Sequence, residues 1–145
     1  MTILYLLIMS TFIQIPNRIK ELTNKSKLDE IFTYAAIRSQ IKDNSCKAIM
    51  LQNQLAELMN VTDRSIRNYI NTLENSGLIK DATKKHGKGE YAYNVYQFDE
   101  LTKEYFIMEP SLITEQSISP KLKGLLMLIK ANCIKGTNYL HFNSQ

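Results

Sequence analysis

An internal repeat constrains the fold of this chain more than any other feature of its sequence. Residues 12–19 resemble residues 106–113 at an offset of 94 positions, and the apolar stretch 31–37 falls on 125–131 at the same offset without a gap. Each copy predicts a short extended segment ended by proline, a polar connection and a strongly apolar helix. Repeated units indicate a repeated architecture, so we expect one complete domain followed by the opening elements of a second.

This pattern divides the chain into three parts. We expect residues 1–11 to be an apolar N-terminal extension, 12–100 to be the complete domain, and 101–145 to be a linker with an incomplete second repeat. The run 1–9 has no Lys or Arg before it, no small-residue cleavage site after it, and fewer than the roughly 18 residues of a spanning helix. A targeting role is therefore not expected; a strand or an upstream extension from a misplaced start codon are the alternatives.

Composition sets broad limits on function. The chain has 145 residues, 44% of them hydrophobic, with only two cysteines and two histidines, so we expect a globular protein of the reducing cytoplasm without a disulfide scaffold or metal site. Its net charge of +4 is uneven, because Lys and Arg exceed Asp and Glu by 7 to 5 in residues 1–60, by 6 to 4 in 61–90, and not at all in 91–145. A basic balance is compatible with nucleic-acid binding but does not establish it.

Periodicity and turn residues predict the order of elements after the first proline. A dense apolar pattern over 27–42 predicts a central helix that is covered on most sides, and a short helix follows from about Asn53. Thr62 is a suitable N-cap for a helix to about Ser76, which Gly77 ends in the left-handed conformation. Residues 78–80 then predict a strand, 84–89 a turn, and 90–98 a returning strand.

Residues 54–79 carry the most specific pattern in the chain. Leu55, Ala56 and Met59 hold the first helix of this segment to a core, and Val61 fills the turn. A second apolar row, at i, i+4 and i+7, buries one face of the following helix; its members are Ile66, Ile70 and Leu73. Together with the glycine and the strand after it, this string resembles the winged helix-turn-helix of bacterial transcription regulators and plasmid replication initiators, over about residues 27–98. The resemblance implies a mainly helical α+β fold, a winged helix-turn-helix with a partial second repeat.

Burial of that aliphatic row turns a polar row outward. In a helix-turn-helix, such a row enters the major groove of double-stranded DNA, where Arg can bond guanine and Asn can bond adenine. The lysines of the predicted turn would contact phosphates as a wing, and His86 is expected to be a polar turn residue. The expected DNA-binding residues are Arg64, Ser65, Arg67, Asn68, Asn71, Lys84, Lys85 and Lys88.

No pattern in the sequence predicts catalysis. Tyr91, Tyr93 and Tyr96 could suggest base stacking or a nicking nucleophile, but a nicking initiator needs paired metal-binding histidines, which the sequence lacks. We instead expect Tyr91, Tyr93 and Val95 to pack against the helices from one strand face. The expected protein is therefore not an enzyme and has no cofactor, metal, small-molecule substrate or membrane partner.

Several roles stay open at this level. Two winged-helix units in tandem resemble plasmid or phage replication initiators, which favours an initiator or a fragment of one over a transcription regulator. A winged helix can also be a protein-interaction module, with a homodimer as the partner state, or the accessory domain of an enzyme. The second repeat could pack on the first domain, exchange with another chain, or represent a truncation.

Overall fold

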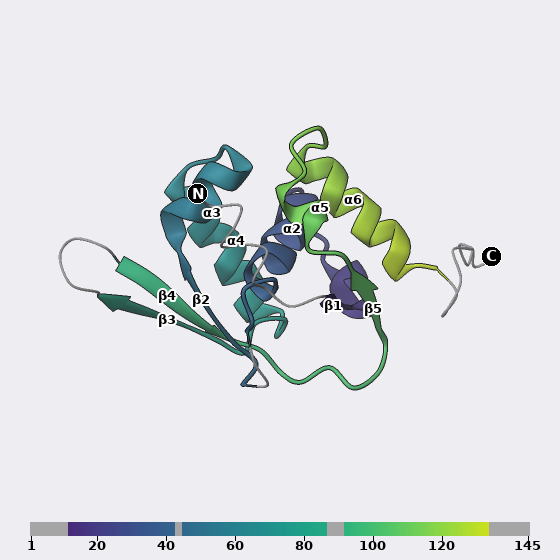
Figure 1. Cartoon of the computed structure of the whole chain (residues 1–145), viewed down its shortest axis with the longest axis horizontal. Helices are drawn as coiled ribbons and strands as arrows, with labels where there is room; N and C mark the ends of the chain where they lie inside the picture. Colours follow the sequence, from purple (N-terminus) through teal and green to yellow (C-terminus); the bar gives the residue numbers. More distant parts are fainter. Residues whose placement is uncertain (1–11, 43–44, 87–91, 134–145) are drawn as a thin grey trace.

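The computed structural model describes residues 12–42, 45–86 and 92–133 of the chain (Figure 1). In this part of the protein, helices predominate and the strands form small antiparallel sheets. The mainly helical α+β class predicted from the sequence is therefore confirmed. The predictions for residues 1–11, for Lys88 and for residues 134–145 lie outside the described residues.

Helix α2 (Lys27–Arg38) is the centre of the fold. Every residue from Asp29 to Gln40 is buried, because α6, α4, β1 and β2 all pack against this helix. The prediction of a central helix covered on most sides is confirmed, although α2 ends at Arg38 rather than at Lys42. Its Tyr34 ring packs edge-on against Phe98 at a centroid distance of 5.4 Å.

A strand precedes two helices and a hairpin in the middle of the chain. The elements are β2 (Lys47–Leu51), α3 (Gln52–Met59), α4 (Asp63–Asn75), β3 (Asp81–His86) and β4 (Ala92–Gln97). Three of them form an antiparallel sheet of order β2-β4-β3. Strand β2 was not predicted, and its pairing with β4 makes β4 the central strand of the sheet.

The buried face of β4 differs from the prediction. Tyr96 and Phe98 are buried, whereas Tyr93 and Val95 are only partly buried, so the expectation that Tyr93 and Val95 form the core face is wrong; Tyr91 lies outside the described residues. The strand pairing explains why Tyr96 is the buried tyrosine, because it lies opposite Ala48 on β2 and Ala82 on β3. Two alanines leave room for one large ring on the core side of the sheet.

The start of the hairpin also differs from the prediction. Leu78 and Ile79 are buried but precede the strand, which begins at Asp81. The backbone N–H of Ile79 donates to the carbonyl oxygen of Leu73 at 3.1 Å. This hydrogen bond belongs to the end of α4 and not to the ladder of the sheet. Residues 84–86, predicted to lie in the turn, belong to β3.

The second segment of the sequence repeat has the same order of elements as the first. Strand β5 (Tyr105–Met108), α5 (Ser111–Thr114) and α6 (Pro120–Ala131) follow the order of β1 (Ile13–Pro16), the 3-10 helix η1 (Asn17–Glu21) and α2. The two segments pack together in one hydrophobic core, since α6 contacts α2 and η1, and α5 contacts α2. The second segment thus packs on the first, as one of the alternatives predicted; exchange with another chain and truncation stay predictions.

The equivalent strands of the two segments, β1 and β5, pair with each other in an antiparallel sheet. Ile13 pairs with Met108, and Gln14 pairs with Ile107, in antiparallel register. At the offset of 94 positions, Met108 is the counterpart of Gln14 and Ile107 the counterpart of Ile13. Ile13 and Gln14 thus pair with each other's counterparts, whereas Ile15 and Pro16 pair with Phe106 and Tyr105, which are the counterparts of residues 12 and 11.

Helices α2 and α6 approach each other closely at Gly124. A Cβ atom on Gly124 would lie 2.1 Å from the carbonyl oxygen of Leu28, and this contact is with backbone, which cannot rotate away. We expect Gly124→Ala to lower the free energy of unfolding by about 1–3 kcal/mol, the usual cost of overpacking. Helix propensity alone would raise it by about 1 kcal/mol, so the sign of the change in urea denaturation decides between the two effects.

Because two tyrosines are buried in the core, we expect the protein to lose stability at high pH. Burial raises the pKa of Tyr34 and of Tyr96 to about 12. In the unfolded chain these phenols ionise near pH 10. Their contribution to the free energy of unfolding is therefore complete below about pH 10 and is lost as the pH rises towards 12. We expect the melting temperature to fall across this interval, and to fall less in a Tyr34→Phe variant. A melting temperature that does not change across it would contradict the assignment.

Candidate nucleic-acid interface

Helix α4 is held at both ends by polar contacts. At its start, the Thr62 hydroxyl oxygen accepts a hydrogen bond from the backbone N–H of Ser65 at 3.2 Å, which confirms the predicted N-cap. At its end, Gly77 has a φ of 81°, the predicted left-handed conformation. The Arg18 guanidinium donates to the Gly77 carbonyl oxygen, so η1 secures the turn that follows α4.

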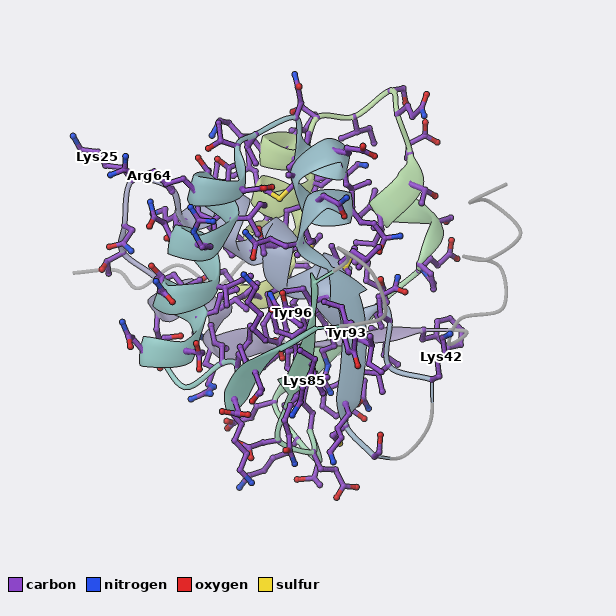
Figure 2. All side chains as sticks on the ribbon, turned by 90° about the vertical axis from the view of Figure 1, so that its left-hand side faces the viewer. Lys25, Lys42, Arg64, Lys85, Tyr93 and Tyr96 are labelled. Atoms are coloured by element: carbon purple, nitrogen blue, oxygen red, sulfur yellow. The ribbon has the colours of Figure 1, made fainter. Side chains whose placement is uncertain are left out.

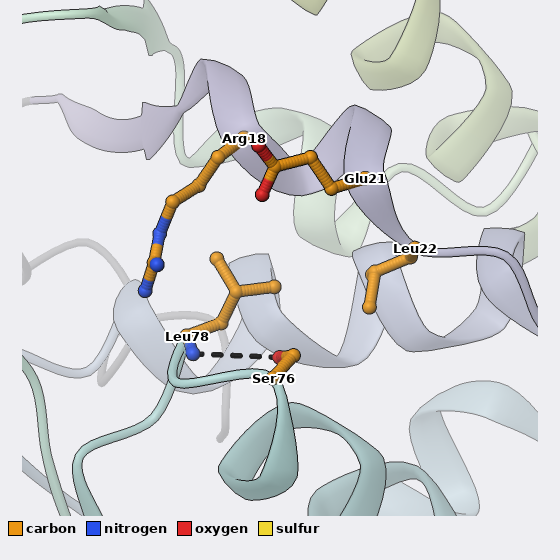
Figure 3. A pocket seen from close by; sticks show the side chains of 5 residues that line it. All are labelled: Arg18, Glu21, Leu22, Ser76 and Leu78. Atoms are coloured by element: carbon orange, nitrogen blue, oxygen red, sulfur yellow. Dashed lines mark hydrogen bonds between the residues drawn. The ribbon is translucent and has the colours of Figure 1, made fainter.

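A small cavity lies beside this turn, between η1 and the residues after α4 (Figure 3). Its volume is about 40 Å³, close to the volume of one water molecule. Within it, the backbone N–H of Leu78 donates to the Ser76 hydroxyl oxygen at 3.4 Å. The cavity is therefore part of the packing of α4 on η1 and has no room for a cofactor.

The inner face of α4 is the aliphatic row predicted from the sequence. Ile66, Ile70 and Leu73 are buried, as are Leu55, Ala56 and Met59 on α3. Tyr69 is also buried on this side, and its hydroxyl donates to Asp29 Oδ2 at 3.2 Å. Burial and the neighbouring Asp29 raise the pKa of Tyr69, which keeps this phenol a neutral donor to the carboxylate.

The outer face of α4 is polar and open to solvent. Arg64, Arg67, Asn68 and Asn71 are all exposed, so none of the four is covered by neighbouring protein. Ser65 differs from them, because it is half-buried and its hydroxyl oxygen accepts from the Thr62 hydroxyl at 3.1 Å. Ser65 therefore belongs to the helix cap more than to the outer face.

The predicted wing lysines lie on a strand. Lys84 and Lys85 are exposed on β3, where they pair with Asn94 and Tyr93 of β4. Successive residues of a strand point to opposite faces of the sheet, so these two ammonium groups lie on different sides of the hairpin. The prediction placed both in a turn, which the structure contradicts; the turn that it assigned to 84–89 extends beyond the described residues.

The structure adds one basic residue that sequence reasoning missed. Lys25 is exposed in the loop before α2, and its neighbour Asn24 reaches α4 through a long hydrogen bond of 3.4 Å from its amide nitrogen to Thr72 Oγ1. Figure 2 shows Lys25 and Arg64 extending to the same side of the molecule, with Lys85 on the hairpin below. Nothing in the spacing of Lys25 from α4 along the chain signals this proximity.

A wider cleft of about 920 Å³ separates α3 from the segment that contains α5 and the start of α6. Its lining includes two carboxylates, Glu57 and Glu115, and the buried stem of Lys123. The Lys123 ammonium donates to the Ile113 carbonyl oxygen at 3.0 Å, and burial lowers the pKa of this lysine. Acidic groups at this cleft repel phosphates, so the outer face of α4 is the better candidate for a nucleic-acid interface.

Comparison with known proteins adds no assignment. No family model, curated protein or solved structure shows significant similarity to this chain. Within the described ranges, no three His, Cys, Asp or Glu side chains come together as a metal site, and no helix has the length and apolar character needed to cross a membrane. Function therefore has to be inferred from the residues themselves.

Proposed function

We propose that residues 27–97 form a winged helix-turn-helix that binds double-stranded DNA in a sequence-specific manner, with α4 in the major groove. The order helix, strand, helix, helix, strand, strand supports this assignment. The hairpin of β3 and β4 then corresponds to the wing. The helix-turn-helix consists of α3 and α4, joined by a turn in which Asn60 is left-handed with a φ of 54°.

The observation that carries the proposal is the sidedness of α4. Its aliphatic row is buried, while the guanidinium groups of Arg64 and Arg67 and the carboxamides of Asn68 and Asn71 face solvent. These are the groups that read base edges, because a guanidinium can donate two hydrogen bonds to guanine and a carboxamide can pair with adenine. Acidic or exposed aliphatic side chains on this face would favour a protein partner, and the face has neither at these four positions.

Phosphate contacts would come from both sides of α4. Lys25 extends from the loop that Asn24 ties to the helix, and Lys84 and Lys85 lie on the neighbouring hairpin. Contacts of this kind position a protein on the duplex and carry no sequence information. Lys84 and Lys85 point to opposite faces of the hairpin, so we treat their phosphate contacts as independent and test each lysine by its own substitution.

For the biological role, we propose an initiator of plasmid or phage type, or a fragment of one. The support is the internal repeat, whose second segment repeats the strand, short helix and long helix that introduce the first unit. Initiators of this type bind repeated origin sequences, so the selected DNA sites should occur in arrays at a replication origin. Isolated sites upstream of genes would favour a transcription regulator.

Substitution on the outer face of α4 should relax sequence discrimination. We expect Arg67→Ala and Asn68→Ala each to reduce the preference for the selected site over altered sites by about 1–3 kcal/mol, because each removes one base-reading group. Selection from random duplexes, followed by binding titrations, measures this. Asn132→Ala, at the exposed residue that follows α6, is the control and should leave the preference unchanged. An Arg67→Ala variant that enriches the same site as strongly as the parent would refute the assignment.

Substitution of the flanking lysines should act on all sequences alike. With about four phosphates neutralised, the logarithm of the binding constant should fall with the logarithm of salt concentration at a slope of roughly −3.6. We expect Lys25→Ala, Lys84→Ala and Lys85→Ala each to flatten this slope by about 0.9. The exposed Lys103 lies between β4 and β5, and Lys103→Ala serves as the control that retains the parental slope. Any of the three lysines whose removal leaves the slope unchanged does not contact phosphate.

A further inference from the structure

The wide cleft beside α3 has a buried cation in its wall. It lies between α3 and the segment of α5 and the start of α6, which Figure 1 shows at the same end of the molecule. Lys123, from the first turn of α6, is only 3% exposed. Its Nζ atom lies 5.3 Å from the centroid of the Phe32 ring and donates to the Ile113 carbonyl oxygen at 3.0 Å. An ammonium group has three N–H donors, and this carbonyl accounts for one of them.

A carboxylate is held in a fixed position in the same cleft. Glu115 is exposed at the end of α5, and its Oε1 atom accepts from the backbone N–H of Ser117 at 3.1 Å and from the Ser117 hydroxyl at 2.9 Å. These hydrogen bonds lower the pKa of Glu115, so the side chain is ionised at neutral pH. Both bonds use the same oxygen, so Oε2 keeps its capacity to accept from another group.

The ammonium of Lys123 and the carboxylate of Glu115 interact without touching. Burial lowers the pKa of Lys123, and the charge of Glu115 acts in the opposite direction, which places the two groups within electrostatic range. In the described ranges, however, the ion pairs join Lys80 to Asp99 and Lys121 to Asp29, and Lys123 and Glu115 form none. A molecule with an anionic and a cationic end can therefore join them by charge-assisted hydrogen bonds.

The rest of the lining is largely apolar. Leu58 of α3 contributes to one wall, and Ile118 and Pro120 contribute to the other. A cleft of about 920 Å³ with apolar walls and a few charged groups has the size and composition of a site for a small molecule. Glu57 adds a second carboxylate, so the charged side chains of the cleft are negative in sum and disfavour a ligand that is only an anion.

We propose that this cleft binds a free α-amino acid with an apolar side chain. The ligand carboxylate accepts from the Lys123 ammonium, the ligand ammonium donates to Glu115, and the apolar side chain lies against Leu58 and Ile118. A zwitterion has no net charge, so the negative sum of the cleft does not oppose it. An amine without a carboxylate would instead bring a second cation to Lys123.

The proposal does not rest on DNA binding. The cleft residues are separate from Arg64, Arg67, Asn68 and Asn71 on the outer face of α4, and amino-acid binding can be measured without DNA. Success or failure of one proposal therefore leaves the other to be decided by its own experiment.

The test is calorimetric titration of the whole chain with L-leucine. L-leucinamide lacks the carboxylate and 4-methylpentanoate lacks the amine, while both keep the same side chain. We expect L-leucine, with about nine non-hydrogen atoms, to bind with a dissociation constant on the order of 0.1–1 mM. Each analogue should bind at least about tenfold more weakly, because it loses one charge-assisted hydrogen bond. L-methionine and L-phenylalanine, titrated in the same way, test whether the apolar walls favour another side chain.

Substitutions separate the two ends of the ligand. Glu115→Gln should weaken L-leucine binding at least about fivefold, a smaller factor because this carboxylate is exposed, and should not weaken 4-methylpentanoate binding. Lys123→Met keeps an unbranched apolar stem without the charge; it should weaken L-leucine binding at least about tenfold and should not weaken L-leucinamide binding. Glu109→Gln changes an exposed glutamate outside the cleft lining and is the control that retains parental binding.

Circular dichroism shows whether each variant is folded. If Lys123→Met misfolds, Glu115→Gln and the two analogues on the parent chain still decide the outcome, because neither disturbs a buried group.

Three outcomes would overturn the proposal. No binding of any of the three amino acids, at concentrations about tenfold above the expected dissociation constant, would show that the cleft is not a site for them. An analogue that binds the parent chain as tightly as L-leucine would show that the missing charge is not recognised. Unchanged L-leucine binding in Glu115→Gln and Lys123→Met would place the site elsewhere. Failure of DNA binding with intact amino-acid binding would overturn the proposed function alone.

Discussion

The burial of α2 from Asp29 to Arg38 is the constraint on which the rest of the structure depends. A helix buried over ten consecutive residues has to be covered on all sides, and no single neighbouring element can do this. The cover comes from α4 and β2 of the first unit and from α6 of the second segment, with β1 alongside. The helix that carries the candidate DNA-reading side chains is thus placed by its packing on α2, while its own outer face contributes nothing to the core.

Asp29 shows how the two segments are connected through that helix. Its Oδ2 atom accepts from Lys121 of α6 at 2.6 Å and from Tyr69 of α4 at 3.2 Å, so one buried carboxylate links the second segment to the inner face of α4. A hydrogen bond to a charged group contributes about 1.5–3 kcal/mol, and the exposure of the Lys121 side chain places its own share at or below the lower end. Without α6, the carboxylate would keep its hydrogen bond from Tyr69 but lose the ion pair with Lys121. The second segment is therefore connected to α4 through the side chain of Asp29.

Local patterns predicted α4 well and the sheet poorly. The cap at Thr62, the left-handed Gly77 and the buried row of Ile66, Ile70 and Leu73 depend on neighbours along the chain, which the sequence states directly. The core face of β4 could not be predicted in this way, because the strand has a tyrosine on each face, Tyr93 on one and Tyr96 on the other. Tyr96 is the buried one because it lies opposite Ala48 and Ala82 on the neighbouring strands. Lys25 and the Asp29–Lys121 pair were missed for the same reason, since each joins residues distant in sequence. The outward position of Arg64, Arg67, Asn68 and Asn71 followed from helix periodicity; what these side chains bind stays a prediction.

The pairing of β1 with β5 has a consequence for how the chain folds during synthesis. Ile13 emerges from the ribosome early, but its partner Met108 and the covering helix α6 emerge only when most of the chain has been made. Contacts between residues so distant in sequence form slowly, because the intervening chain must be ordered first. Until then, the aliphatic surface of α2 that α6 will cover is open to water and to other nascent chains. The core around α2 is therefore completed only when the second segment has been made.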